Sequence, residues 1–140
     1  RFKLINDAYG HAVGDEVIKE ITEISKRNVR GSDILARYGG EEFVILIRDL
    51  DIIIAKSVGE RIRRQLEKQR IYLKHYDDRE RVTVSCGVAQ FPLHSKSIKE
   101  VIEKADEALY YAKSIGKNIV VSYDEIGMPR EALERSQLGI

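Results

Sequence analysis

Two adjacent glycines followed by two adjacent glutamates, Gly39-Gly40-Glu41-Glu42, constrain the fold of this chain more than any other feature. Apolar stretches lie on both sides, and they predict strands over 34–38 and 43–47. The layout is that of a β-hairpin whose turn lacks side chains and whose tip carries two negative charges. Glycine lets another molecule lie close against the backbone, and carboxylates are suitable ligands for Mg²⁺. The hairpin therefore points to nucleotide chemistry, with a plain solvated turn as the alternative.

The composition favours one soluble globular domain. The 140 residues are 43% apolar and 34% charged, enough for a single hydrophobic core. With 24 basic and 23 acidic residues the net charge is +1, so no strong field favours nucleic acid or a membrane surface. The single cysteine, Cys86, excludes an intrachain disulfide and fits a reducing compartment. No apolar run reaches the roughly 20 residues of a membrane span, and we expect no signal peptide before the domain. We expect a cytoplasmic domain, although its parent protein could be membrane-anchored.

Hydrophobic periodicity predicts three helices and two further strand regions. The helices are expected to start at Gly14-Asp15 and end near Gly31, to run from Asp51 to Gln69, and to run from Ser97 to Ile115. The second hairpin is expected to have arms at 71–75 and 82–89 around a turn at 77–79, and the last strand to cover 119–122.

This order of elements predicts an α+β fold. Its central sheet contains antiparallel strands and has flanking helices, as in the ferredoxin-like or polymerase-palm type. Such a topology normally starts with a strand, and none precedes Phe2, so the sheet is expected to lack its first strand. We expect residues 1–123 to form this N-terminally truncated domain and residues 124–140 to form a tail or linker helix.

Five separated blocks of sequence are similar to one known family, the GGDEF-domain diguanylate cyclases, here with the Gly-Gly-Glu-Glu-Phe form of the hairpin. The resemblance covers roughly residues 1–123. The blocks are 2–7 with 10–11 and 14–15, 37–43, 82–88, 104–110, and 112–118.

The resemblance implies an enzyme that condenses two GTP molecules into cyclic di-GMP and two pyrophosphates, with Mg²⁺ or Mn²⁺ as cofactor. Each subunit would provide half of an active site, so a homodimer is implied for turnover. A sensor domain upstream in the parent protein is also implied.

The resemblance makes Glu41 the key acid, a metal ligand that helps to deprotonate the attacking hydroxyl. Glu42 is a second catalytic candidate, although adjacent strand residues point to opposite faces. Gly39 and Gly40 would let the phosphates approach the backbone. Without the other blocks, a charged hairpin tip would be the better interpretation of both glutamates.

The resemblance also implies which residues bind the guanine base of the nucleotide. Asn6 and Asp15 are similar to residues that read guanine, since an amide and a carboxylate together match its edge. Asp15 could equally cap a helix. His11 resembles a further substrate contact, with a structural histidine as the alternative, and Ile18 is better interpreted as core.

Three lysines are candidates for the triphosphate. Lys113 and Lys117 resemble the family's phosphate-binding pair near the end of the last helix, and Lys3 is a third candidate. The family more often has arginine at the position of Lys117, so the charge is kept here while the bidentate fork is lost. Solvated surface lysines are the alternative.

A second site is implied by Arg30 and Asp33, which match the family's Arg-x-x-Asp site for inhibition by bound cyclic di-GMP. Arg61 matches the position of a helper arginine. A polar turn between a helix and a strand is the alternative interpretation.

The match fails at the first metal-binding carboxylate, which the family places before the Phe-Lys pair and this sequence does not contain. A single carboxylate holds Mg²⁺ poorly, so residues 1–140 alone could lack turnover. Two other functions stay open: a catalytically silent module that senses cyclic di-GMP or GTP, and a GTP-binding regulatory domain attached to a phosphodiesterase. The intact Gly39–Phe43 motif favours catalysis.

Overall fold

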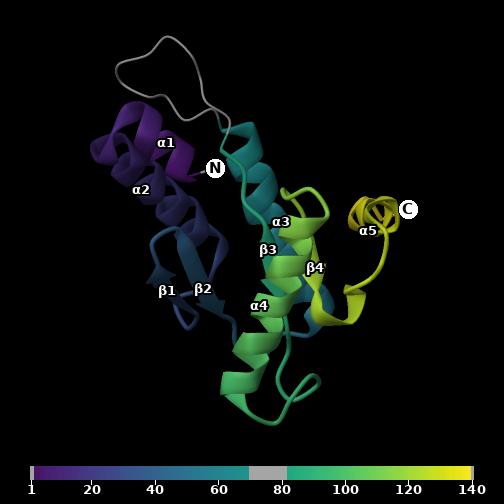
Figure 1. The fold of residues 1–140 in the computed structure, drawn as a ribbon. Coiled ribbons are helices and arrows are strands. Elements are labelled where there is room, and N and C mark those ends of the chain that lie inside the picture. The colour runs from purple at the N-terminus through teal and green to yellow at the C-terminus, as the bar shows by residue number, and fades with distance from the viewer. Residues whose placement is uncertain (1, 70–81, 140) are drawn as a thin grey trace. The chain divides into compact units, whose positions relative to one another are not determined.

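The computed structural model describes residues 2–69 and 82–139, which form two compact units (Figure 1). The first unit comprises Arg1–Asp49 and Gln65–Val82, and the second comprises Leu50–Arg64 and Thr83–Ile140. Helices alternate with short strands in the described ranges, so the expected α+β fold with flanking helices is confirmed. The expected central sheet is represented there by two two-stranded sheets, β1 with β2 and β3 with β4.

The first unit contains two helices and a hairpin: α1 (Phe2–Tyr9), α2 (His11–Asn28), β1 (Ile34–Gly39) and β2 (Glu42–Leu46). The strands pair antiparallel, as the sequence predicted. A small core joins α1 to α2, and its buried members are Ile5, Val13, Val17 and Val82.

The start of the first helix was predicted wrongly. Instead of beginning at Gly14, α2 begins at His11, and the separate helix α1 precedes it. Phe2, Ile5 and Tyr9 are three and four residues apart, so they form one apolar face that packs against α2. Gly10, with φ of 87°, separates the two helices in a conformation that favours glycine.

The second unit contains most of α3 (Ile52–Lys68), together with β3 (Cys86–Val88), α4 (Ile98–Ser114), β4 (Val120–Ser122), the 3₁₀ turn η1 (Tyr123–Glu125) and α5 (Arg130–Gln137). Both expected long helices are confirmed to within a residue. Their starts are capped by side chains: Asp51 accepts a hydrogen bond from the Ile54 N–H at 2.9 Å, and Ser97 accepts one from Glu100 at 3.4 Å.

The strand expected over 82–89 is shorter than predicted. Only Cys86–Val88 is strand, and the structure pairs it in parallel with β4. An alternating apolar pattern shows which side chains are suited to burial, but a strand also needs a neighbouring strand to accept its backbone hydrogen bonds. Residues 82–85 pair with no described strand. The other expected arm, 71–75, and the turn at 77–79 lie outside the described residues.

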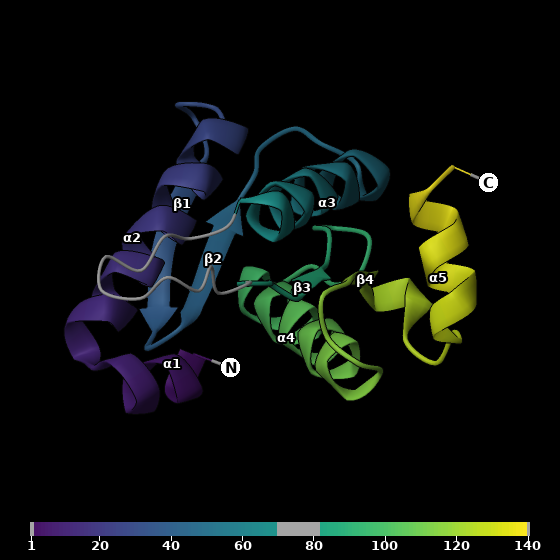
Figure 2. The same ribbon diagram turned by 90° about the horizontal axis from the view of Figure 1, so that it is seen from above.

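The core of the second unit lies where α4, β4 and α5 meet. Figure 2 shows α4 along the strand pair and α5 beside β4. The buried members of this core are Ala108, Ala112, Ile119, Val121 and Leu133. Across the ranges 2–69 and 82–139, no helix has the length and apolar character needed to traverse a bilayer.

Candidate functional site

The hairpin tip is open because it has no side chains at its turn. A Cβ built on Gly39 or Gly40 would meet no atom within 4 Å. The register slips between Arg37 and Gly39, which leaves a bulge before the turn. Arg37 then holds the turn from one side, since its Nε and Nη2 donate to the Gly40 carbonyl at 2.9 and 2.5 Å. The result is a bare backbone in a fixed conformation.

A hollow of about 390 Å³ lies within the first unit, between the tip and α1. It gathers several of the residues predicted from the sequence. Its lining consists of Phe2, Lys3, Asn6, Gly39, Gly40, Glu41 and Glu42. Two carboxylates, one ammonium and one amide thus surround an opening whose floor includes peptide backbone, an arrangement able to bind a polar, phosphate-bearing molecule.

Asn6 is the one residue of the hollow with a buried polar atom that lacks a partner. Its Oδ1 is buried, and it makes no hydrogen bond to the part of the chain that the structure describes. The amide packs directly on Gly14, where an added Cβ would lie 1.8 Å from Oδ1. Buried acceptors are nearly always satisfied, so the unpaired Oδ1 marks Asn6 as a candidate for a ligand contact.

The two acidic residues of the tip differ in exposure. Glu41 is exposed, and its carboxylate has no partner among the described residues, whereas Glu42 is half-buried. Within residues 2–69 and 82–139, no three His, Cys, Asp or Glu side chains lie close enough to hold a metal ion. The donor set fits Mg²⁺ only when nucleotide phosphates and waters complete the shell, which is how this ion usually binds.

Asp15 and His11 both lie on α2, and both are exposed. Neither lines the hollow. The alternative interpretation of Asp15 as a helix cap is wrong, because α2 begins four residues earlier and its N-cap residue is Gly10. Ile18 is buried, as predicted.

Arg30 and Asp33 face each other at the turn between α2 and β1. The Arg30 Nε lies 3.6 Å from Asp33 Oδ2, and the arginine side chain is 54% exposed. The hydrogen bond from the Arg30 backbone N–H, at 2.8 Å, lowers the pKa of the Asp33 carboxyl. A second one comes from the Arg48 N–H. Asp33 is therefore ionised and held in place, while the Arg30 guanidinium keeps an open side. Arg61, the third predicted member, is exposed and lies in the second unit.

In the second unit, the predicted phosphate-binding lysines lie at the end of α4 and in the loop that leaves it. Lys113 lies in the last turn of α4, and Lys117 follows in the loop; both are exposed. Gly116, Lys117 and Asn118 have φ values of 115°, 63° and 51°. Three consecutive residues in the left-handed region form a sharp turn, and two of them are not glycine.

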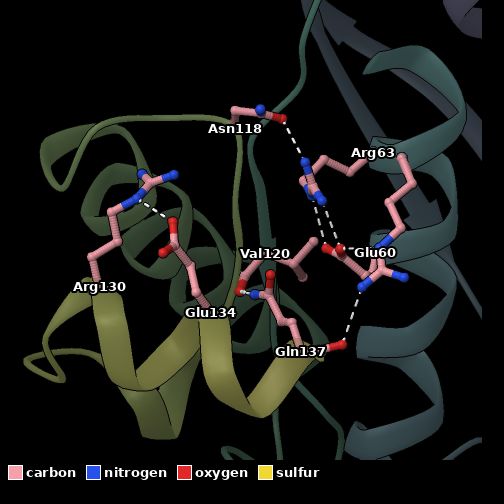
Figure 3. A network of polar contacts seen from close by, with 8 residues as sticks. Glu60, Arg63, Asn118, Val120, Arg130, Glu134 and Gln137 are labelled. Atoms are coloured by element: carbon pink, nitrogen blue, oxygen red, sulfur yellow. Dashed lines mark hydrogen bonds and ion pairs between the residues drawn. The ribbon is translucent and has the colours of Figure 1, made fainter. Parts of the chain in front are cut away.

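The same loop is tied to α3 by a network of charged groups (Figure 3). Arg63 donates to the Asn118 Oδ1 at 2.8 Å, and it also pairs with Glu60 at 2.7 Å. Burial alone would raise the pKa of Glu60, but hydrogen bonds from Arg63 and Arg64 outweigh it and hold the pKa below its ordinary value. Burial raises the pKa of the Cys86 thiol to about 12, so the thiol stays protonated and is a poor nucleophile, although the residue as a whole is only half-buried.

Sequence reasoning missed three residues. Phe2 lines the hollow, Arg37 holds the turn, and Arg130 of α5 binds the backbone of the α4 exit loop. The arginine two positions before Gly39 was a signal available in the sequence. Nothing in the polar segment after residue 123 indicated the contact of Arg130.

Comparison with known proteins places these features in one family. Residues 1–119 match the family model described as diguanylate cyclase, GGDEF domain. Diguanylate cyclase A of Treponema denticola is 43% identical over 120 residues, which cover 85% of this chain and 32% of that protein. The chain therefore spans about a third of that relative's length.

Two solved structures are similar throughout most of the chain. The GGDEF domain of DgcB from Caulobacter crescentus in complex with c-di-GMP has a TM-score of 0.80 and 32% identity, covering 88% of this chain and 72% of that one. The active GGEEF domain of a diguanylate cyclase from Vibrio cholerae has a TM-score of 0.77 and 28% identity, covering 88% and 76%.

Proposed function

Because the chain belongs to the GGDEF family of diguanylate cyclase domains, we propose that it supplies half of a two-subunit site that condenses two GTP molecules into cyclic di-GMP. The observation that carries the proposal is the hollow of the first unit. There the buried, unpaired Oδ1 of Asn6 lies beside the open Gly39-Gly40 backbone and the carboxylate of Glu41.

The hollow fits a guanine nucleotide. Asn6 Oδ1 is proposed to accept a hydrogen bond from the base, and the Asp15 carboxylate, which does not line the hollow itself, to accept from the guanine N1 and N2 donors. Adenine would leave the buried acceptor unpaired, at a cost of about 1–3 kcal/mol. In the first unit, the phosphates approach the Gly39-Gly40 backbone near Lys3. Lys113 and Lys117 are proposed as phosphate-binding residues from the family resemblance. His11 is a proposed further contact.

The reaction is a phosphoryl transfer in which each nucleotide is both nucleophile and electrophile. The 3′-hydroxyl of one GTP attacks the α-phosphorus of the other, the new 3′ phosphodiester bond forms, and the bond to the β-phosphate breaks. The hydroxyl proton passes to Glu41, with Glu42 as the second catalytic acid of the tip, and pyrophosphate leaves with its electron pair. Mg²⁺ or Mn²⁺ held by Glu41 and the phosphates would supply charge neutralisation in the transition state.

One hollow holds one GTP, so turnover requires a second copy that brings its own nucleotide. We therefore propose a homodimer in which two hollows face each other and the reaction repeats with the roles exchanged. Holding the two nucleotides in line supplies much of the rate, since proximity replaces a bimolecular encounter.

Arg30, Asp33 and Arg61 are proposed to bind cyclic di-GMP and to inhibit the enzyme. The ionised Asp33 accepts from a guanine edge, and the half-exposed guanidinium of Arg30 is available to a phosphate or a base. The c-di-GMP complex of the similar DgcB domain supports a product site of this kind.

The test uses the full natural protein that contains residues 1–140. It is incubated with GTP and Mg²⁺, and cyclic di-GMP is measured by mass spectrometry. We expect Glu41→Gln to lower the rate by about 100-fold or more, since it removes the carboxylate at the reacting centre. Glu23→Gln, the same change on an exposed part of α2, is expected to leave the rate unchanged.

Equal rates for Glu41→Gln and the unaltered protein would contradict the catalytic role. A second outcome is that the unaltered protein makes no product but binds cyclic di-GMP, and that Arg30→Ala abolishes this binding. The domain is then a catalytically silent sensing module. The intact tip, shared with the active GGEEF domain from Vibrio cholerae, favours catalysis.

A further inference from the structure

The C-terminal helix α5 is built into the second unit. Leu133 is completely buried against Ala108 and Ala112 of α4 and against Ile119 and Val121. Gln137 adds a hydrogen bond from its Nε2 to the Val120 carbonyl at 2.6 Å (Figure 3). The family match ends at residue 119, so α5 lies beyond the part of the chain that the family model covers.

Arg130, the first residue of α5, binds the loop that leaves α4. Its Nη1 donates to the Ile115 carbonyl at 3.1 Å and to the Lys117 carbonyl at 2.9 Å. Glu134, one turn later, accepts from the Nε at 2.6 Å and so orients the guanidinium. Gly116 leaves room for the guanidinium, because a Cβ at this position would lie 2.9 Å from Nη1.

The loop needs such support because its backbone is strained. Lys117 and Asn118 both have positive φ, and non-glycine residues keep this conformation only where their surroundings impose it. Asn118 is held by Ser85 Oγ at its N–H and by Arg63 at its Oδ1. The Lys117 N–H donates to the Ala112 carbonyl at 3.0 Å, and the Lys117 carbonyl accepts from Arg130, its partner in the described chain.

We propose that Arg130 is a positioning residue for triphosphate binding: it fixes the backbone of Lys117 and thereby the direction of the ammonium group. The proposal rests on the proposed function, which assigns Lys117 to the phosphates of GTP. A lysine is a compact charge on a flexible stem, so the position of its Cα decides how often the ammonium meets a phosphate. By this inference, α5 strengthens nucleotide binding through Arg130, and it lies outside the residues that the family model covers.

The experiment measures equilibrium binding by calorimetry in the full natural protein with Mg²⁺. One ligand is a GTP analogue with a methylene bridge between the α- and β-phosphates, which cannot react, and the other is guanosine, which has no phosphates. The variants are Arg130→Gln, Lys117→Ala and the double variant. The matched control is Arg135→Gln, the same change at an exposed position of α5.

We expect Arg130→Gln to weaken binding of the analogue about three- to tenfold and to leave guanosine binding unchanged. Because the effect passes through Lys117, adding Arg130→Gln to Lys117→Ala should cost nothing further, whereas independent residues would add. Arg130→Lys should restore part of the affinity, since an ammonium can donate to both carbonyls.

An unchanged affinity in Arg130→Gln, an equal loss for guanosine, or a full additional loss in the double variant would each overturn the positioning role alone. If the unaltered protein fails to bind the analogue, the proposed function falls, and the positioning role falls with it. Should Arg130→Gln melt below the assay temperature, Glu134→Ala replaces it, because that change removes the acceptor of the Nε while keeping the guanidinium. No loss of affinity for the analogue would then overturn the proposal.

Discussion

Around the hollow of the first unit, two side chains carry polar atoms that lack partners in the described chain, whereas backbone groups of the 115–118 loop in the second unit are paired. The Oδ1 of Asn6 and the carboxylate of Glu41 make no hydrogen bond there. In the loop, the carbonyls of Ile115 and Lys117 both accept from Arg130, and the Asn118 N–H donates to Ser85.

The difference separates two ways in which a nucleotide site is prepared. The hollow keeps acceptors and bare backbone for the ligand, at a cost in stability for each buried group without a partner. In the loop, the backbone groups form hydrogen bonds within the protein, which by our proposal hold Lys117 in place. Substitutions in the first region should therefore change binding more than folding, and those in the second region should change folding more.

The largest effect is expected for Gly87→Ala, which tests how tightly the second unit is packed. A Cβ at position 87 would lie 2.0 Å from the Ala105 carbonyl oxygen and 2.3 Å from the Leu109 nitrogen. Both are backbone atoms of α4 and cannot rotate away. We expect the free energy of unfolding to fall by about 3 kcal/mol or more, measured by denaturant titration.

The matched control is Gly31→Ala, since a Cβ there meets no atom within 4 Å. It should change stability by less than about 0.5 kcal/mol. Equal stabilities of the two variants would mean that α4 does not lie directly on β3.

The next effect concerns Glu60, the acid that ties α3 to the loop through Arg63. The folded state lowers its pKa from the ordinary 4.5, so its stabilisation is fully present above that pH and is lost as the pH falls through the folded value. Glu60→Gln should cost about 2 kcal/mol at pH 7, and the cost should shrink as the pH falls through the folded pKa, because the carboxylate then becomes protonated in the folded state as well.

Thermal melts between pH 3 and pH 7 check this prediction. Glu131→Gln, which changes an exposed acid of α5, is the control. A constant difference between Glu60→Gln and the parent over the whole range would show that the charge of Glu60 does not support the fold.

Gly14→Ala applies the chemical change of Gly87→Ala to the first unit, with the opposite expected outcome. Its Cβ would lie 1.8 Å from Asn6 Oδ1, which is a side-chain atom and can rotate away. Alanine also favours the helix α2 by up to about 1 kcal/mol, so stability should change little. Binding of the unreactive GTP analogue should weaken about tenfold, since the displaced amide no longer meets the base.

The binding constant and the melting temperature, measured on the same preparation, separate the two effects. Gly31→Ala again serves as the control. A large loss of stability with unchanged affinity would reverse the comparison between the two regions.

The sequence predicted most of the architecture because its signals were local. Two helices were predicted to within one residue, as their apolar spacing and the caps Asp51 and Ser97 are visible in the chain. The helix α1 was missed, because a segment of eight residues is too short for its apolar spacing alone to distinguish a helix from a strand or a loop. The pairing of Cys86–Val88 with β4 was also missed, since parallel partners far apart in sequence leave no local pattern.

The candidate site was predictable where it follows motifs, and Lys3, Asn6 and the hairpin tip do line one hollow. Supporting contacts were not predictable, because they depend on side chains that fold back onto backbone carbonyls. Arg130 lies 13 residues after the carbonyl that it binds, in a segment whose composition indicates only a polar helix. Arg37 lies inside the motif, yet its bond to Gly40 depends on the bulge between β1 and β2.

The smallest effect is expected for that contact. Arg37→Gln removes both hydrogen bonds to the Gly40 carbonyl, so the turn should sample more conformations before the nucleotide binds. Because the contact is exposed, stability should change by less than about 1 kcal/mol. Affinity for the GTP analogue should fall about threefold, since ordering the loop becomes part of the cost of binding. Arg27→Gln, an exposed arginine of α2, is the control. A loss of stability without a loss of affinity would place Arg37 with the residues that hold the fold, and the hollow would then depend less on its turn than its open geometry indicates.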